Sequence, residues 1–135
     1  MTKKIHCPLC EIAQTDPGKR IIKKNEHAYY IQDAYPVSEG HALIVPFRHV
    51  GSFFETTTHE RIALFALLHT AKSHIESTTK PDGYNIGIND GVAAGQTIAH
   101  LHLHLIPRHK GDVKDPRGGL RWIMPEKADY WSQHE

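Results

Sequence analysis

Apolar residues recur along this chain with two different periods. Residues 28–33, 41–46 and 84–89 are short runs rich in apolar, aromatic and β-branched residues, bounded by turn-forming residues, and each run predicts a strand. Residues 20–24 are a weaker candidate for a short strand or a connection. In residues 100–105 histidine and leucine alternate strictly, which is the period of a strand. One face of that strand would place three leucines in a core, and the other would carry three imidazoles.

A helical period appears in the middle of the chain. Thr57 and Glu60 fit a capping box, with Thr57 at the N-cap. The residues that follow predict one long helix over 60–78, because apolar side chains recur at helical spacing at Ile62, Phe65, Leu68, Ala71 and Ile75. Residues 11–15 predict a short helix that ends at an Asp-Pro-Gly turn, and residues 120–125 predict a short edge strand. Together these elements predict an α+β fold with a mainly antiparallel five-stranded sheet, one long helix and one or two short helices.

Composition narrows the class of protein. A length of 135 residues predicts a single domain over 1–135, with a core of about 7–112 and a polar tail over 113–135. The net charge of +1 gives no strong field toward nucleic acid or anionic lipid, so we expect neither as a partner. No apolar run approaches the ~20 residues of a membrane span, and the first residues lack the apolar stretch of a signal peptide. We therefore expect a cytoplasmic protein.

The pair Cys7-Pro8-Leu9-Cys10 allows three interpretations. It is a redox dithiol, half of a zinc site, or two unrelated buried thiols. Only six residues precede it, too few for the strand that normally leads into a redox Cys-x-x-Cys motif. A zinc site needs two further ligands, and the twelve histidines spread along the chain offer many.

The histidine run favours chemistry over mere solvation. In one use, two adjacent histidines, ~6.7 Å apart along a strand, bind a metal. In the other, one imidazole attacks phosphorus while its neighbours handle charge and protons. Nearby Asn89, Gln96 and Thr97 are uncharged donors suited to phosphate oxygens, and the Gly/Ala loop over 90–96 is able to turn backbone N–H groups toward an anion. These neighbours favour the second use.

The run His100-Leu-His102-Leu-His104-Leu-Ile matches the His-x-His-x-His-x-x signature of the histidine triad (HIT) family without a departure. The resemblance spans roughly residues 7–112, because other motifs agree in order and separation: Ile31-Gln32-Asp33, Val45-Pro46-Phe47-Arg48-His49, Asn89-Asp-Gly and Gly95-Gln96-Thr97. It implies a HIT-like fold and an enzyme that hydrolyses nucleotide–X substrates at the α-phosphate.

The resemblance also implies a role for each residue. His102 would be the nucleophile that becomes nucleotidylated, His100 would orient it through its backbone carbonyl, and His104 would contact the α-phosphate. Asp33 would accept hydrogen bonds from the ribose hydroxyls. Phosphate oxygens and the leaving group would be held by Asn89, Gly95, Gln96 and Thr97. Water would then release a nucleoside monophosphate.

A structural zinc ion and a homodimer are further implications of the resemblance. Some bacterial-type members bind zinc through the positions that are Cys7, Cys10, His49 and His100 here, whereas members without the cysteines pair the two histidines by a hydrogen bond. Such a Cys₂His₂ set is a closed, structural site. Members of this kind usually form homodimers through the long helix and an adjacent strand.

The substrate stays open between dinucleoside polyphosphates, such as diadenosine tetraphosphate, and adenosine phosphoramidates. The tail from Arg117 to Pro125 resembles tails of bacterial HIT proteins called diadenosine tetraphosphate hydrolases. Arg117 or Arg121 would meet the extra phosphates, or both are surface charges on a polar tail. Two other classes also remain: a nucleotide-binding sensor with incidental hydrolysis, and a metal hydrolase with ions on His102 and His104.

Overall fold

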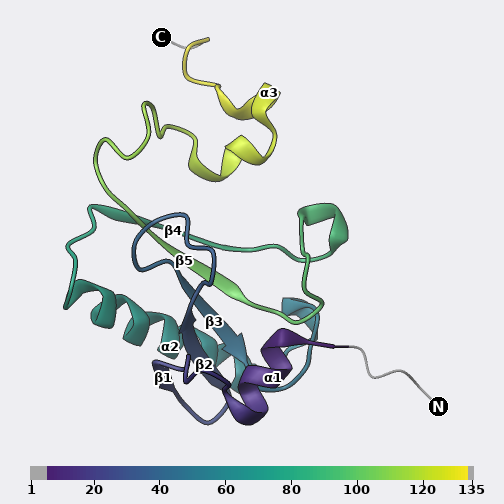
Figure 1. Ribbon diagram of the computed structural model, residues 1–135. Coiled ribbons are helices and arrows are strands. Elements are labelled where there is room, and N and C mark those ends of the chain that lie inside the picture. The colour runs from purple at the N-terminus through teal and green to yellow at the C-terminus, as the bar shows by residue number, and fades with distance from the viewer. Residues whose placement is uncertain (1–5, 134–135) are drawn as a thin grey trace.

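One antiparallel sheet forms the centre of the computed structural model, which describes residues 6–133 (Figure 1). Its strands lie in the order β1-β2-β3-β5-β4, and every neighbouring pair is antiparallel. The strands are β1 (Lys23–Lys24), β2 (Ala28–Gln32), β3 (Ala42–Pro46), β4 (Gly83–Ile88) and β5 (Leu103–Arg108). The predicted α+β class and the five-stranded antiparallel sheet are confirmed.

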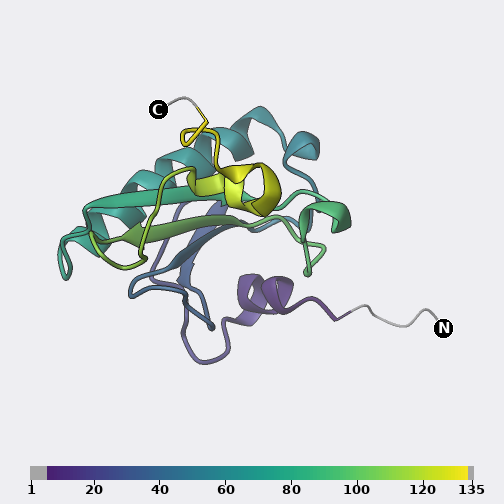
Figure 2. The ribbon, with the colours of Figure 1, turned by 90° about the horizontal axis from the view of Figure 1, so that it is seen from above.

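Two helices cover opposite faces of the sheet, as Figure 2 shows. The long helix α2 (Thr58–Glu76) lies along one face, and the short helix α1 (Pro8–Thr15) lies on the other. Short elements complete the chain: η1 (Phe53–Glu55), η2 (Val92–Ala94), η3 (Gly119–Ile123) and α3 (Pro125–Ala128). Within residues 6–133 no helix combines the length and apolar character that crossing a bilayer requires.

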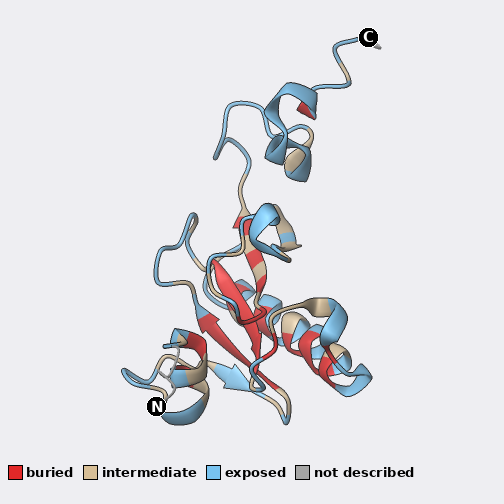
Figure 3. Cartoon of the chain, turned by 90° about the vertical axis from the view of Figure 1, so that its right-hand side faces the viewer, coloured by how far each residue is buried: buried red, intermediate tan, exposed pale blue. Residues whose placement is uncertain are grey.

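The alternation of side chains along each strand divides the core into two clusters. Figure 3 shows the buried residues gathered in the central strands and in the helices beside them. The larger cluster lies under α2 and contains Ile44, Leu64, Leu67, Leu101, Leu103 and Leu105, among others. The smaller cluster lies under α1 and contains Leu9, Ile12, Tyr29, Ile31, Leu43 and Val45. His104 pairs with Leu43 across the ladder, so its side chain belongs to the α1 face.

The long helix has the predicted cap, and its buried side agrees with the predicted one at Leu68, Ala71 and Ile75 but not at Ile62 and Phe65. The Glu60 N–H donates to Thr57 Oγ1 at 3.1 Å, and the Thr57 N–H donates to Glu60 Oε1 at 2.8 Å, which confirms the capping box. The helix spans Thr58–Glu76 rather than 60–78. Its buried apolar residues are Ala63, Leu64, Leu67, Ala71 and Ile75, whereas Ile62 and Phe65 are 61% and 51% exposed.

The histidine run is only partly a strand. Strand β5 begins at Leu103, so His104 lies in it while His100 and His102 precede it. The chain is drawn away before that point, because the Leu101 N–H bonds to the Val50 carbonyl at 2.7 Å instead of extending the ladder with β3. Leu101, Leu103 and Leu105 still share the core under α2, so the expected leucine face is confirmed.

The tail contains no strand at 120–125, and the predicted edge strand there is wrong. Residues Gly119–Ile123 form η3, which α3 follows. The Arg121 guanidinium donates to the Lys127 and Ala128 carbonyls at 2.6 and 3.0 Å, and the Trp122 indole N–H donates to the Arg117 carbonyl at 2.7 Å. These side chain to backbone bonds coil the segment on itself, beyond the β4 edge of the sheet (Figures 1 and 3).

Candidate functional site

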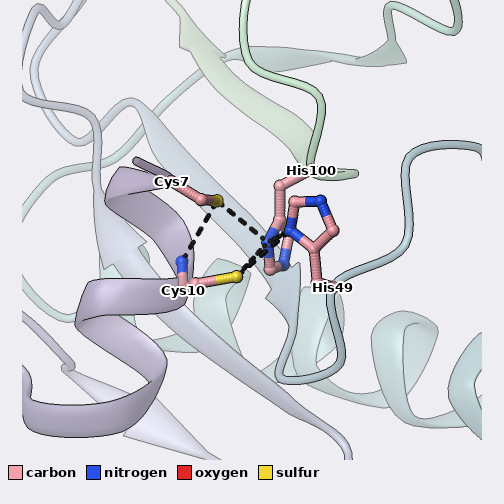
Figure 4. A group of neighbouring side chains, drawn as sticks. All are labelled: Cys7, Cys10, His49 and His100. Carbon is pink, nitrogen blue, oxygen red and sulfur yellow. Dashed lines mark hydrogen bonds between the residues drawn. The ribbon is translucent and has the colours of Figure 1, made fainter. Parts of the chain in front are cut away.

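Four metal-ligating side chains from three distant segments converge beside the start of β5 (Figure 4). Cys7 and Cys10 come from the start of α1, His49 from the loop after β3, and His100 from the bend before β5. The Cys10 Sγ lies 3.1 Å from His49 Nδ1 and 3.4 Å from His100 Nδ1. The Cys7 Sγ lies 3.4 Å from the same His100 nitrogen. The structure thus brings together all four residues of the predicted zinc set.

The spacing of these atoms fits a tetrahedral ion. Zinc–sulfur bonds of about 2.3 Å and zinc–nitrogen bonds of about 2.0–2.1 Å place tetrahedral ligand atoms roughly 3.3–3.8 Å apart. His49 Nδ1 and His100 Nδ1 are 3.2 Å apart, close to that range. The His100 Nε2–H donates to the Pro46 carbonyl at 2.8 Å, which leaves Nδ1 with its lone pair directed into the cluster. Of the three interpretations of the cysteine pair, this geometry favours the metal site.

The two thiols lie close together, and a bound cation would change their protonation. Burial and the neighbouring Cys7 raise the pKa of the Cys10 thiol to about 11. A bound divalent cation reverses this effect, because it is the thiolate that ligates metal. The residues present therefore fit an ion held by two cysteines and two histidines in donor type and spacing, and the His100 tautomer suits it.

His102 lies next to this cluster and is held by it. Its Nδ1–H donates to the His100 carbonyl at 2.9 Å. A neutral imidazole with its proton on Nδ1 has its lone pair on Nε2, where it is available for attack. His100 thus contributes its side chain to the cluster and its carbonyl to His102, which is the arrangement expected from the sequence.

A second cluster contains Asp33, His41 and His104. The His41 Nε2 lies 2.9 Å from His104 Nδ1 and 3.5 Å from Asp33 Oδ2. Sequence reasoning named Asp33 and His104 but missed His41. No local signal marks it, because His41 shares a side of the sheet with His104 only through the pairing of Leu43 with His104 in the β3–β5 ladder.

Burial keeps both imidazoles of this cluster neutral. It lowers the pKa of His41, although the nearby Asp33 carboxylate opposes the change. Burial, together with His102 and His41, lowers the pKa of His104 to about 4. Near neutral pH each ring therefore has one N–H and one lone pair, and the hydrogen bonds decide which nitrogen carries the proton.

The loop before the histidines differs from the expected anion cradle. Its backbone N–H groups at Ala94, Gly95 and Gln96 donate to the carbonyls of Gly91 and Val92 at 3.0–3.1 Å, so the loop uses them internally. Gly91 and Gly95 have φ of 96° and 95°, a region that suits glycine. The expectation that these amides face an anion is not supported.

The other predicted phosphate contacts lie on or beside this loop. The Gln96 side chain connects the two ends of the loop and joins the loop to Gly51. It accepts from the Gly91 N–H at 2.8 Å and donates to the Gly51 carbonyl at 2.9 Å. Asn89 and Thr97 are exposed. Phosphate binding by Asn89, Gly95, Gln96 and Thr97 stays a prediction.

The two tail arginines are engaged within the tail. The Arg117 guanidinium pairs with Asp115 at 3.1 Å and lies 4.7 Å from the Trp131 ring centre. Arg121 lies 4.8 Å from the Tyr130 ring centre, in addition to its two carbonyl contacts. These contacts give both arginines a structural role in the tail.

A family model described as the HIT domain matches residues 14–111. AP-4-A phosphorylase of Mycobacterium tuberculosis (strain H37Rv) is 35% identical over 108 residues, which make up 78% of this chain and 55% of that protein. The asymmetrical bis(5'-nucleosyl)-tetraphosphatase of Schizosaccharomyces pombe is 34% identical over 98 residues, 73% of this chain and 54% of that protein. The chain spans about half the length of each of these two relatives.

Crystal structures of two bacterial proteins resemble this one. A Zn-bound histidine triad family protein from Mycobacterium smegmatis superposes with a TM-score of 0.71 at 34% identity, covering 78% of this chain and 77% of that one. A member of the HIT family from Bacillus subtilis has a TM-score of 0.73 at 27% identity, covering 96% of this chain and 94% of that one. The second likeness therefore extends into the tail.

Proposed function

This chain belongs to the histidine triad (HIT) family, and from that premise we propose that it is a nucleotide hydrolase. Its substrates are nucleotide–X compounds cleaved at the α-phosphate, with release of a nucleoside monophosphate. The observation that carries the proposal is the bond from His102 Nδ1–H to the His100 carbonyl, 2.9 Å long, because it leaves Nε2 of His102 unprotonated.

The reaction has two displacements at phosphorus. His102 Nε2 attacks the α-phosphorus, a nitrogen–phosphorus bond forms, and the bond to X breaks, so that X takes the electron pair. The His100 carbonyl stabilises the positive charge that develops on the imidazole, since it accepts the Nδ1–H throughout. Water then attacks the same phosphorus and His102 leaves as a neutral imidazole, while one proton passes to solvent or to X.

The other proposed roles follow from position. His104 lies beside His102, with ring centres 5.2 Å apart, and contacts the α-phosphate. Asp33 accepts hydrogen bonds from the ribose hydroxyls through its carboxylate. Asn89, Gln96 and Thr97 hold phosphate oxygens or the leaving group through their side chains, whereas Gly95, whose N–H bonds to the Val92 carbonyl, contributes through the positive φ that the loop requires.

Dinucleoside polyphosphates are the preferred substrate class. The names of two relatives, a phosphorylase and a tetraphosphatase of such compounds, support this choice. The two activities differ in whether phosphate or water resolves the intermediate, and we propose water here. Adenosine phosphoramidates remain the alternative, because attack at the α-phosphorus is the same for both.

We propose a structural zinc ion held by Cys7, Cys10, His49 and His100. The ligand spacing supports it, as does the Zn-bound relative from Mycobacterium smegmatis. The ion supplies no chemistry to the reaction. It joins the start of α1 to the segment that presents the His100 carbonyl to His102.

We also propose a homodimer through α2 and the edge strand β4. The outward side of α2 exposes Ile62 and Phe65, and β4 exposes Ile86 at 48%. Such apolar exposure beside an unpaired strand edge suits a second copy of the chain. A solution mass near twice 15.3 kDa supports this proposal, and a mass near 15.3 kDa at micromolar concentration contradicts it.

The decisive experiment measures turnover of diadenosine tetraphosphate and of an adenosine phosphoramidate by wild type, His102→Ala and His59→Ala. His59 is an exposed histidine in the first turn of α2 and serves as a matched control. We expect His102→Ala to lose ~10³-fold or more in kcat, the scale of losing a nucleophile, with the control unchanged.

Each alternative predicts a different result. Substantial activity in His102→Ala contradicts the nucleophile. Tight nucleotide binding without turnover in wild type favours the sensor. A metal hydrolase predicts loss of activity when EDTA is added, whereas the proposed mechanism predicts retention for as long as the structural ion stays bound.

A further inference from the structure

We propose that His41 is a positioning residue that fixes the proton of His104 on Nε2, and that the backbone N–H of Val37 fixes His41 in turn. Neither His41 nor Val37 belongs to the histidine signature. The catalytic consequence rests on the proposed function, whereas the proton positions follow from the hydrogen bonds alone.

The first link is the bond from Val37 to His41. The Val37 backbone N–H lies 3.2 Å from His41 Nδ1. A backbone amide only donates, so Nδ1 of His41 must be the nitrogen with the lone pair. The residue is 3% exposed, and burial keeps the ring neutral by lowering its pKa, so its single ring proton is on Nε2.

The second link is the hydrogen bond from His41 to His104, which determines the proton position on His104. The Nε2–H of His41 lies 2.9 Å from His104 Nδ1, which must accept. His104 therefore carries its proton on Nε2. The Asp33 carboxylate is a more distant second acceptor for the same N–H, at 3.5 Å.

The turn that supplies the Val37 amide is anchored to the strand of His104. Ser38 Oγ donates to the Pro107 carbonyl at 2.8 Å, and the His41 N–H bonds to the Ser38 carbonyl at 3.1 Å. Val37 itself is 72% exposed, so its side chain contributes little and its backbone matters. The hydrogen bond that fixes the His41 tautomer thus comes from the connection between β2 and β3, and the Ser38 bond to Pro107 holds this connection against β5.

This arrangement gives the two neighbouring imidazoles opposite functions. The His100 carbonyl leaves His102 with a lone pair on Nε2, which suits a nucleophile. The chain from Val37 through His41 leaves His104 with an N–H on Nε2, which suits a donor to an anionic phosphate oxygen. One backbone carbonyl and one backbone amide therefore assign nucleophile and donor to chemically identical side chains.

The same three side chains offer one competing use. Asp33, His41 and His104 have ligand atoms within 4.8 Å of one another, a set that is also able to hold a divalent cation. The Val37 bond opposes this use, because a His41 ring protonated on Nε2 has no lone pair there for a metal.

The test combines ¹⁵N NMR of the histidine rings with kinetics, using His41→Met, His41→Gln and the control His59→Gln. Methionine removes the N–H at similar volume, whereas the glutamine amide is able to donate to His104 Nδ1. In wild type we expect His104 to show an unprotonated Nδ1 and a protonated Nε2, and the same in His41→Gln and His59→Gln. In His41→Met we expect a mixture of both proton positions.

Kinetics on diadenosine tetraphosphate should follow the proton positions. We expect kcat to fall ~10-fold in His41→Met with KM changed less than ~3-fold, the scale of weakening one positioned donor, and to be restored by His41→Gln. A wild-type His104 with its proton on Nδ1 overturns the proposal, as does a second zinc equivalent bound by wild type and His59→Gln but not by His41→Gln. The NMR result is obtained on protein without substrate, so it tests the proton positions even if nucleotide turnover is absent. If His41→Met does not fold, the proton position of His104 in wild type still tests the proposal.

Discussion

Two clusters flank His102, one built on His100 and the other on His104, and they use the same side chain differently. Both outer histidines carry the proton on Nε2 and present the Nδ1 lone pair to their cluster. At His100 that lone pair faces two thiols and a second imidazole, a set for a cation. At His104 it accepts a hydrogen bond from the His41 Nε2–H, so this cluster needs no cation. The partner atoms, rather than the residue type, separate a structural site from a reactive one.

The largest difference between the two clusters should appear when a thiol is removed. In Cys10→Ser we expect zinc content to fall from about one ion per chain to near zero and the free energy of unfolding to drop by about 3 kcal/mol or more, because a structural zinc contributes directly to folding. The measurements are elemental analysis without chelator and denaturant unfolding. His104→Asn, at the other cluster, should retain zinc. Well under one zinc per chain in wild type would contradict the assignment of the first cluster.

Acid should distinguish the clusters next. The pKa of His104 is lowered from 6.5 to about 4, so the unfolded chain binds this proton first as the pH falls. The contribution of neutral His104 to the free energy of unfolding is therefore fully present above pH 6.5, and it is lost as the pH falls from 6.5 to 4. The full shift corresponds to about 3 kcal/mol, and because His104 is only partly shielded from solvent we expect the free energy of unfolding to fall by about 2 kcal/mol more in wild type than in His104→Asn over that range. Urea unfolding at pH 7, 5.5 and 4, with zinc content recorded, measures it; equal losses in both proteins would refute the lowered pKa.

The smallest of these effects should come from Asp33. Asp33→Asn keeps the size of the side chain but replaces a carboxylate acceptor, so we expect KM for diadenosine tetraphosphate to rise ~10-fold, about the value of one hydrogen bond to a charged group. Zinc content and stability should remain as in wild type, which separates this cluster from the cysteine one. An unchanged KM would remove Asp33 from ribose binding.

The order of elements was predictable from local pattern. The strands at 28–33, 41–46 and 84–89 and the capping box at Thr57 all appear in the structure, because period and cap chemistry act over a few residues. The predicted edge strand at 120–125 was wrong, because the Arg121 and Trp122 side chains bond to carbonyls five to seven residues away and coil that segment, which apolar periodicity alone does not indicate. The division into a core over 7–112 and a tail over 113–135 stays a prediction.

By itself the sequence indicated the family and the antiparallel α+β architecture, because motif order and apolar periodicity are written along the chain. The resemblance to that family, rather than spacing alone, named the four residues of the cysteine–histidine cluster. Only the tertiary structure placed the ring protons of His41, His100, His102 and His104, brought His41 to His104, and showed the loop amides at 94–96 bonded to carbonyls of their own loop. The His41–His104 and His100–Pro46 hydrogen bonds join segments 63 and 54 residues apart, which no local pattern records. The shorter bonds of Val37 and His102 depend on a turn and a bend whose geometry the rest of the fold holds.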